Sequence, residues 1–159
     1  MIEFERTQDM EKVREILVSP RIWPFFADDF APSPGDFRPN DDSRIWYVLA
    51  REGDRFLGVF MFIPQSKILW EAHVAMLPSA WGGAARRAWK EVIPWLFEHT
   101  DCERLIAEIA EYNRPALSFA QVAGMEQYGR NPRSVAWHGK MWDLVLFGLS
   151  RGLERSAWR

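Results

Sequence analysis

Residues 78–87 read PSAWGGAARR, and they join a strand-like run to a helical pattern. Gly82 and Gly83 stand where that helix should begin, and Arg86 and Arg87 follow in its first turn. The first turn of a helix carries unpaired N–H groups and a partial positive charge, and both favour an anion. Glycine also allows a positive φ and close approach of the backbone to a ligand. The stretch predicts an anion-binding turn, and the alternative is an ordinary connecting turn with solvated arginines.

The segments around this stretch predict a mixed domain. Alternating or apolar runs predict strands at 2–6, 44–51, 56–63, 68–76, 104–110, 134–137 and 141–149. Apolar stripes at helical spacing predict a first helix capped by Thr7, a second over 84–99 and a third capped by Asn113. The fold class is therefore α/β (α+β), with a central mixed, mostly antiparallel sheet of about seven strands flanked by about four helices.

Composition limits the class of protein. A chain of 159 residues suits one domain, which we place at 1–150 with a tail at 151–159. A net charge of −2 gives no reason to expect nucleic acid, and no apolar run reaches the roughly 20 residues of a membrane helix. One cysteine excludes an internal disulfide, and it forms no metal-ligand pattern with the three histidines. We expect a cytoplasmic protein without metal, nucleic-acid or membrane partners.

Residues 21–42 predict a long irregular loop with one helical turn. The segment holds four prolines, five aromatic residues and five aspartates. Loops of this length in a compact domain are often binding loops or lids, although some are only mobile. An acidic, aromatic rim would suit a cationic amine, and the alternative is a lid that packs on the sheet.

A second segment, residues 108–125, reads EIAEYNRPALSFAQVAGM and by itself predicts a well-capped helix after a strand. Together, in this order, the two segments resemble the GNAT superfamily of N-acetyltransferases over roughly residues 1–150. The first is similar to that family's pyrophosphate-binding motif, and the second to its Asn-x-x-Ala-(x)7-Gly-Phe segment, with Met125 in the Phe place. Residues 71–82, 95–98 and 113–117 also resemble small acetyltransferase-like proteins encoded in phages and prophages.

The resemblance implies acetyl-CoA as co-substrate, bound where the fourth and fifth strands separate. Its pantetheine arm would pair with backbone groups around Ala75 and Met76. The residues implied for the rest of the cofactor are Trp81, Gly82, Gly83, Ala84, Ala85, Arg86, Asn113 and Phe119. Ala84 stands where the family's loop has its main glycine, so a strained or remodelled loop is expected there.

The resemblance also implies direct transfer of acetyl to a primary amine on a small molecule or peptide. Glu71 and His73 are two residues apart on one strand and therefore share a face, which makes them candidate bases. The alternative is a pair that only bond each other or solvent. The N–H group of Met76 is the candidate donor to the oxyanion.

Ala120 stands where many family members have a tyrosine that protonates the departing thiolate. The acid is then absent, or supplied by Tyr128, Ser118 or water. This departure favours the alternative function, a non-catalytic acyl-CoA-binding or protein-interaction module, whereas Glu71 and His73 favour an enzyme.

Nine tryptophans against three tyrosines are an unusual excess. Core packing is the interpretation for six of them: Trp46, Trp70, Trp89, Trp95, Trp137 and Trp142. Trp81 is a candidate cofactor contact in the 78–87 loop, and Trp158 is a candidate contact in a homodimer. The candidate acceptor-binding residues are Trp23, Phe26, Asp28 and Asp29.

Overall fold

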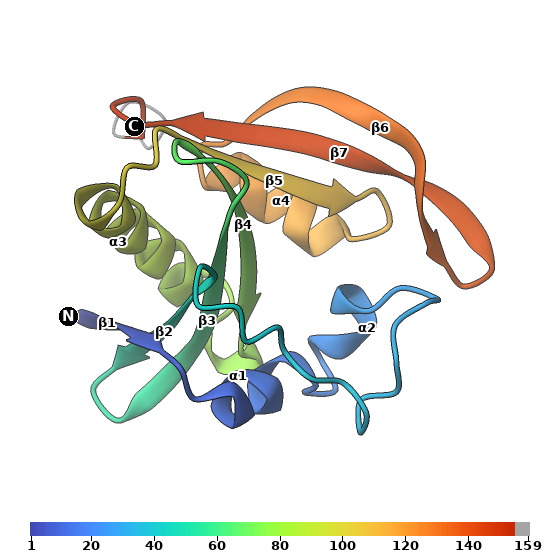
Figure 1. Cartoon of the computed structure of the whole chain (residues 1–159), viewed down its shortest axis with the longest axis horizontal. Helices are drawn as coiled ribbons and strands as arrows, with labels where there is room; N and C mark the ends of the chain where they lie inside the picture. Colours follow the sequence, from blue (N-terminus) through green and yellow to red (C-terminus); the bar gives the residue numbers. More distant parts are fainter. Residues whose placement is uncertain (155–159) are drawn as a thin grey trace.

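Residues 1–154, which this computed structural model describes, form seven strands, four α-helices and one 3₁₀ turn (Figure 1). In chain order these are β1 (Ile2–Thr7), α1 (Met10–Leu17), α2 (Trp23–Phe26), β2 (Trp46–Glu52), β3 (Arg55–Pro64), β4 (Leu69–Met76), η1 (Pro78–Ala80), α3 (Gly83–His99), β5 (Arg104–Ala110), α4 (Arg114–Val122), β6 (Glu126–Trp137) and β7 (Lys140–Ser150). The sheet has the order β1-β2-β3-β4-β5-β7-β6, and every neighbouring pair is antiparallel except β4 and β5. The predicted fold class is confirmed.

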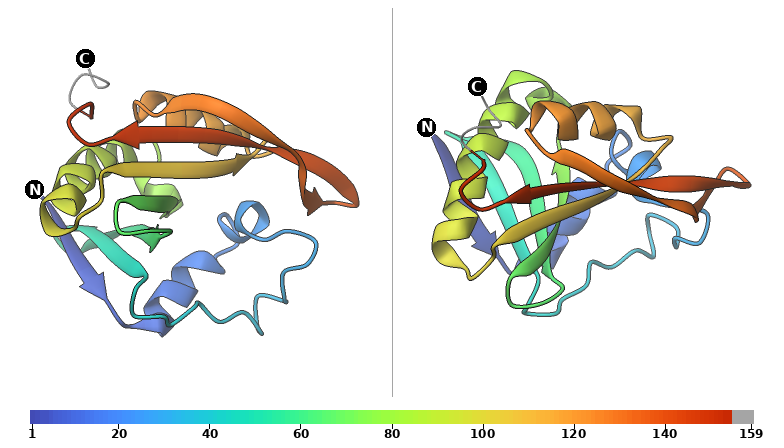
Figure 2. Two further views of the ribbon diagram at one scale, coloured as in Figure 1. Left: turned by 45° about the horizontal axis from the view of Figure 1, so that its top comes forward. Right: turned by 90° about the horizontal axis from the view of Figure 1, so that it is seen from above.

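The parallel strands β4 and β5 pair only at their beginnings. Leu69 lies opposite Arg104 and Glu71 opposite Ile106, and no register pair follows. Beyond this point β4 is paired only with β3, and β5 only with β7. The two strands diverge toward their carboxyl ends (Figure 2). The backbone of β4 therefore has an edge that no strand covers, in the middle of the sheet.

Helices cover both faces of the sheet, with α3 and α4 on one face and α1 on the other (Figure 2). The larger core lies under α3 and α4, and the smaller one surrounds Val13, Ile16 and Leu17 of α1. None of the helices in the described part of the chain is long and apolar enough to cross a membrane.

The tryptophans divide between core and surface. Trp89 and Trp70 are buried in the larger core, and Trp46 and Trp95 pack against it. The core assignment of Trp137 and Trp142 is wrong, because neither belongs to a core cluster. The long β6–β7 hairpin extends beyond the helices that cover the sheet, so its aromatic residues contact each other instead.

The first helix is capped by Asp9 and not by Thr7. Thr7 is the last residue of β1, and its hydroxyl accepts the N–H of Asp9 at 3.0 Å. The Asp9 carboxylate in turn accepts the N–H of Lys12 at 3.0 Å. Asp and Thr are both good caps, so the sequence allows either and the extent of β1 decides between them.

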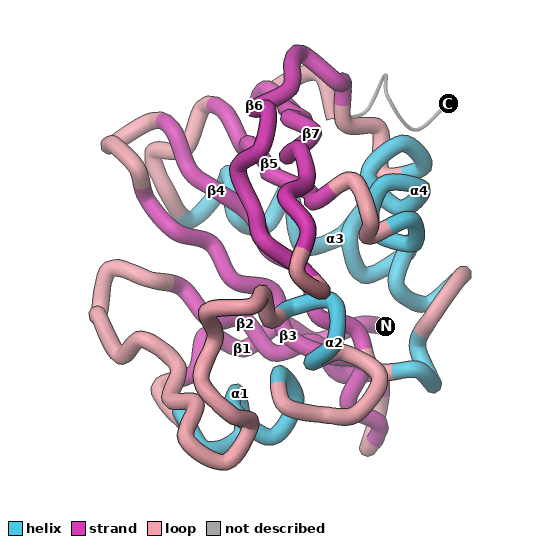
Figure 3. The backbone as a smooth tube through the Cα atoms, turned by 90° about the vertical axis from the view of Figure 1, so that its right-hand side faces the viewer, coloured by secondary structure: helices cyan, strands magenta, loops and turns pink. Residues whose placement is uncertain are grey.

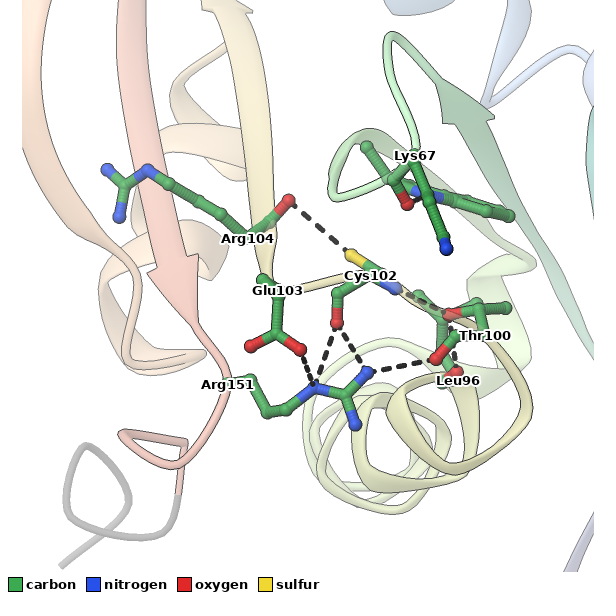
Figure 4. A network of polar contacts seen from close by, with 8 residues as sticks. Lys67, Leu96, Thr100, Cys102, Glu103, Arg104 and Arg151 are labelled. Atoms are coloured by element: carbon green, nitrogen blue, oxygen red, sulfur yellow. Dashed lines mark hydrogen bonds and ion pairs between the residues drawn. The ribbon is translucent and has the colours of Figure 1, made fainter.

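The chain after β7 does not leave the domain at residue 151, where we expected the tail to begin. The guanidinium of Arg151 donates to the carbonyls of Thr100 at 2.9 Å and Cys102 at 2.6 and 3.0 Å, and it pairs with Glu103 at 3.1 Å (Figure 4). It also lies over the ring of Phe97. These contacts attach the end of β7 to the loop between α3 and β5. Residues 155–159, including Trp158 and its expected subunit contact, lie outside the described residues.

Candidate functional site

The loop before α3 presents four unpaired N–H groups. Gly82 has a φ of +84° and precedes the first helical residue, and Arg86 is the first residue whose N–H bonds back, to the carbonyl of Gly82. Among residues 1–154, no acceptor is bound by the N–H groups of Gly82, Gly83, Ala84 or Ala85. These groups form an anion-binding helix terminus.

The strain expected at Ala84 is absent. The positive φ of this loop falls on Gly82, and Ala84 already lies inside the helix. Glycine is therefore present at the position that needs it. Arg86 projects from the first turn of α3, is exposed, and has no partner among the described residues.

Trp81 fixes the loop to the end of β4. Its indole N–H donates to the carbonyl of Met76 at 2.8 Å, while its ring stays about half exposed at 48%. The guanidinium of Arg21 lies over this ring, 5.1 Å from its centroid. The loop that carries the free N–H groups is therefore held against the uncovered edge of β4.

The backbone of Met76 faces that edge. The N–H of Leu77 donates to the carbonyl of Leu57 in β3 at 2.8 Å. Backbone groups of successive strand residues point to opposite sides, so those of Met76 point away from β3 and those of Ala75 toward it. Of the two residues expected to meet the pantetheine arm, only Met76 offers its own N–H to the open edge.

Helix α4 begins as predicted beside the end of β5. The side-chain oxygen of Asn113 accepts the N–H of Ala116 at 3.2 Å, which leaves its amide NH₂ unused within residues 1–154. Phe119 packs edge-on against Trp89, with the ring centroids 6.0 Å apart. Phe119 is half-buried against the larger core and forms part of the α3–α4 contact.

The position of the family's tyrosine is buried in this chain, and Tyr128 lies too far away to replace that acid. Ala120 is 2% exposed and belongs to the core. Tyr128 lies beside Arg104, at the end of β5 that still pairs with β4. The diverging end of β5 is six residues further along this seven-residue strand, so Tyr128 is remote from the open edge of β4.

Glu71 and His73 form a hydrogen-bonded pair on the α1 face of β4. His73 Nε2 lies 2.8 Å from Glu71 Oε1, and the other Glu71 oxygen accepts the side-chain N–H of Gln65 at 3.0 Å. The hydrogen bond from His73 lowers the pKa of the Glu71 carboxyl, against the opposing effect of burial. A carboxylate can only accept, so Nε2 carries the proton and Nδ1 of the neutral ring keeps its lone pair. Glu71 thus orients His73, and His73 is the stronger base candidate.

Glu108 on β5 projects from the same face, and the sequence interpretation missed it. Because Glu71 lies opposite Ile106, residue 108 lies across the diverging strands from His73. Glu108 is exposed and has no cationic partner among residues 1–154. The two-residue period of the strand predicted at 104–110, which places residue 108 on one face with residues 104 and 106, was the signal that could have identified it.

The 21–42 loop lies against the far end of the β6–β7 hairpin (Figure 3). Both carboxylate oxygens of Asp29 accept hairpin N–H groups at 2.8 Å, from His138 and Gly139. The indole of Trp137 donates to the carbonyl of Pro24 at 3.1 Å. Asp29 therefore holds the loop on the hairpin, which leaves its carboxylate occupied.

The other predicted acceptor residues lie nearby. Asp28 is exposed and accepts only the N–H of Phe30, at 2.9 Å. Trp23 and Phe26 contact each other and both contact Phe37, with centroids 5.1–5.9 Å apart. This aromatic cluster gives the loop a small core of its own.

Tyr112 joins this region from the end of β5, and the sequence interpretation did not single it out. Its ring stacks on Trp137 at 4.1 Å and meets Trp142 edge-on. Burial raises the pKa of the Tyr112 hydroxyl, and the charges of Asp28 and Asp29 raise it further. The acidic loop, the hairpin and the diverging end of β5 therefore converge.

A cavity of about 500 Å³ opens elsewhere, between the β3–β4 turn and the end of α3. Its lining includes Trp46, Trp70, Lys67 and His99. It lies at the opposite end of β4 from the free N–H groups, and its Lys67 is paired with Asp101. We assign no chemistry to it. No group of three or more potential metal ligands occurs among the described residues.

Comparison with known proteins gives one family. A model of the acetyltransferase (GNAT) family matches residues 10–125. No curated protein sequence matches the chain significantly.

Among solved structures, a spermidine N-acetyltransferase from Vibrio cholerae, in complex with CoA and spermine, is similar with a TM-score of 0.78 and 12% identity. The similarity covers 97% of this chain and 98% of that one. A ribosomal-protein-S5-alanine acetyltransferase from Vibrio fischeri has a TM-score of 0.72 and 12% identity, over 95% and 92% of the two chains. At these identities the likeness concerns the fold.

Proposed function

Because this chain belongs to the acetyltransferase (GNAT) family, we propose that it transfers acetyl from acetyl-CoA directly to a primary amine. One observation carries the proposal: the uncovered edge of β4 leads straight into the four free N–H groups before α3. An extended arm with a pyrophosphate at one end fits such an arrangement, because the edge offers strand-like hydrogen bonds and the helix terminus offers donors to the anion.

The cofactor side of the site has groups for each part of CoA. The N–H of Met76 would meet the thioester end, and the N–H groups of residues 82–85 would bind the pyrophosphate. Arg86 adds a free guanidinium, and Asn113 adds an amide NH₂ that no described residue uses. The structurally similar Vibrio cholerae enzyme is in complex with CoA, which supports acetyl-CoA as the co-substrate.

The reaction uses two groups of β4. His73 Nδ1 removes a proton from the acceptor ammonium, and the amine then attacks the carbonyl carbon of the thioester. The N–H of Met76 donates to the oxyanion that forms. The C–S bond breaks as the carbonyl re-forms, the thiolate takes its proton from water or from the His73 imidazolium, and the amide nitrogen loses its second proton to water. Positioning of the amine against a reactive thioester supplies much of the acceleration.

The acceptor is a cationic amine. Asp28 and Glu108 are carboxylates without a cationic partner among residues 1–154, and Glu71 adds a third charge on the same side of the sheet. The two structural relatives act on spermidine and on an alanine of a ribosomal protein, so the fold serves both small molecules and peptides. The likeness to phage- and prophage-encoded proteins stays a prediction.

The test combines binding with product formation. Titration of the wild-type protein with acetyl-CoA measures affinity, and release of free CoA thiol is followed with polyamines and peptide amines as acceptors. His73→Asn should keep acetyl-CoA affinity and lower kcat by roughly 10²–10⁴-fold. Glu71→Gln should lower kcat less, because it disorders the base without removing it. Glu5→Gln, on the exposed face of β1, is the matched control.

Two results would count against the proposal. Absence of acetyl-CoA binding by the wild type would refute the cofactor assignment. Binding without thiol release from any acceptor would favour the non-catalytic acyl-CoA-binding alternative, which the buried Ala120 supports.

A further inference from the structure

Arg21 is a cation without a counterion beside the cofactor loop. Its guanidinium lies over Trp81, and among residues 1–154 no carboxylate pairs with it. Arg21 is exposed and lies two residues before α2. It belongs to the 21–42 loop, which we call the acceptor loop, and not to the elements that build the cofactor site.

The charge around the start of α3 is unbalanced. The first turn of α3 holds no acidic residue, and Arg86 and Arg87 are the fourth and fifth residues of the helix, although cations are unfavourable at a helix N-terminus. Glu52 pairs with Arg87 at 3.1 Å and leaves Arg86 unpaired. Arg21 and Arg86 therefore add two uncompensated charges to the four free N–H groups.

Trp81 provides a platform for the guanidinium. The bond from its indole to Met76 fixes the ring, and its face remains available to a cation. A guanidinium that lies over an aromatic face keeps its N–H donors free to reach an oxyanion. Arg21 thus brings a positive charge to the cofactor loop from another part of the chain.

We propose that Arg21 is a phosphate ligand of CoA, contributed by the acceptor loop, and that cofactor binding thereby positions this loop for the amine. The inference rests on the proposed function. Arg21 is followed by α2, by Asp28 and by the Asp29 contacts to the hairpin. A phosphate held by Arg21 therefore restrains the loop at its beginning, while the hairpin restrains it at Asp29.

The experiment measures CoA affinity and loop protection in the same proteins. Arg21→Ala should weaken CoA binding about tenfold in calorimetry, which corresponds to about 1.4 kcal/mol. Arg21→Lys should fall between Arg21→Ala and the wild type, because lysine keeps the charge without the planar stack. Arg38→Ala is the matched control, since Arg38 lies in the same loop, is exposed, and bonds only the nearby carbonyls of Gly35 and Phe37. Its CoA affinity should equal that of the wild type.

Hydrogen exchange of residues 22–37, at CoA concentrations that saturate each protein, tests the coupling. CoA should slow exchange in the wild type and in Arg38→Ala, but not in Arg21→Ala. Equal CoA affinity of Arg21→Ala and the wild type would overturn the ligand role, and equal protection of the loop would overturn the coupling. Failure of the wild type itself to bind CoA would instead refute the proposed function. Thermal melting of each variant without CoA checks that it is folded.

Discussion

Replacing Gly58 with alanine should separate β3 from β4 at the point where the proposed cofactor edge begins. Gly58 has a φ of +153° and lies opposite Met76 in the ladder. A Cβ placed on it would stand 2.7 Å from the Cα of Met76 and closer still to the carbonyl oxygen of Ala75. Both contacts are with backbone, so no side chain can rotate away.

Two unfavourable terms should lower the free energy of unfolding of Gly58→Ala. A non-glycine residue in a rarely populated φ region costs about 1–3 kcal/mol, and overpacking of a well-packed site costs a similar ~1–3 kcal/mol. In a domain of this size each kcal/mol lowers Tm by about 2–4 °C, so a fall of roughly 5–20 °C is expected. The shift of Met76 should also disturb its bond to Trp81 and weaken CoA binding.

The assay is thermal or urea unfolding of Gly58→Ala beside Gly53→Ala. Gly53 also has a positive φ, of +60°, but a Cβ there would meet nothing within 4 Å. The control therefore contains the backbone cost alone, about 1–2 kcal/mol. If Gly58→Ala is no less stable than Gly53→Ala, the inference that β3 and β4 approach too closely at Gly58 for a Cβ is refuted.

Three further predictions concern single side chains. Asn113→Ala should lose the cap of α4 and about 1 kcal/mol, measured by urea unfolding, whereas Asn113→Asp should keep it. Arg151→Ala should lose about 2 kcal/mol, because the carbonyls of Thr100 and Cys102 lose a charged donor; unchanged stability would contradict this. Burial raises the pKa of the Cys102 thiol to about 11, so Ellman's reagent at pH 8 should label it only after unfolding. As pH rises, the Cys102 thiol ionises at a lower pH in the unfolded chain than in the folded one. The free energy of unfolding should therefore fall as pH rises from about 9 to 11, and Cys102→Ala should lack this fall.

Local features of the fold could be predicted from the sequence. The Asn113 cap, the positive φ in the Gly82–Gly83 turn and the shared face of Glu71 and His73 all depend on residues within a few positions of one another. Backbone geometry determines such features, because helix and strand periods are fixed. The predicted cap of the first helix, Thr7, is wrong because Asp9 is also a good cap and follows two residues later.

Local sequence patterns were not enough to predict the candidate site. The hydrogen bond between Glu71 and His73, and not their spacing alone, separates the orienting carboxylate from the base. The family motif aligns Ala84 with a glycine, which predicts strain at Ala84. In the structure α3 begins at Gly83, and the positive φ falls on Gly82, where a glycine adopts it without strain.

The sequence by itself determined the order of elements, the resemblance to acetyltransferases and the residues at the start of α3 and α4. Only the tertiary structure decided how far β4 and β5 pair, where Arg21 lies and which carboxylates remain unpaired. Asp29 illustrates the difference, because its partners His138 and Gly139 are 109 and 110 residues away. Contacts of this kind depend on how the sheet twists and how the loop packs, and neither periodicity nor capping carries that information.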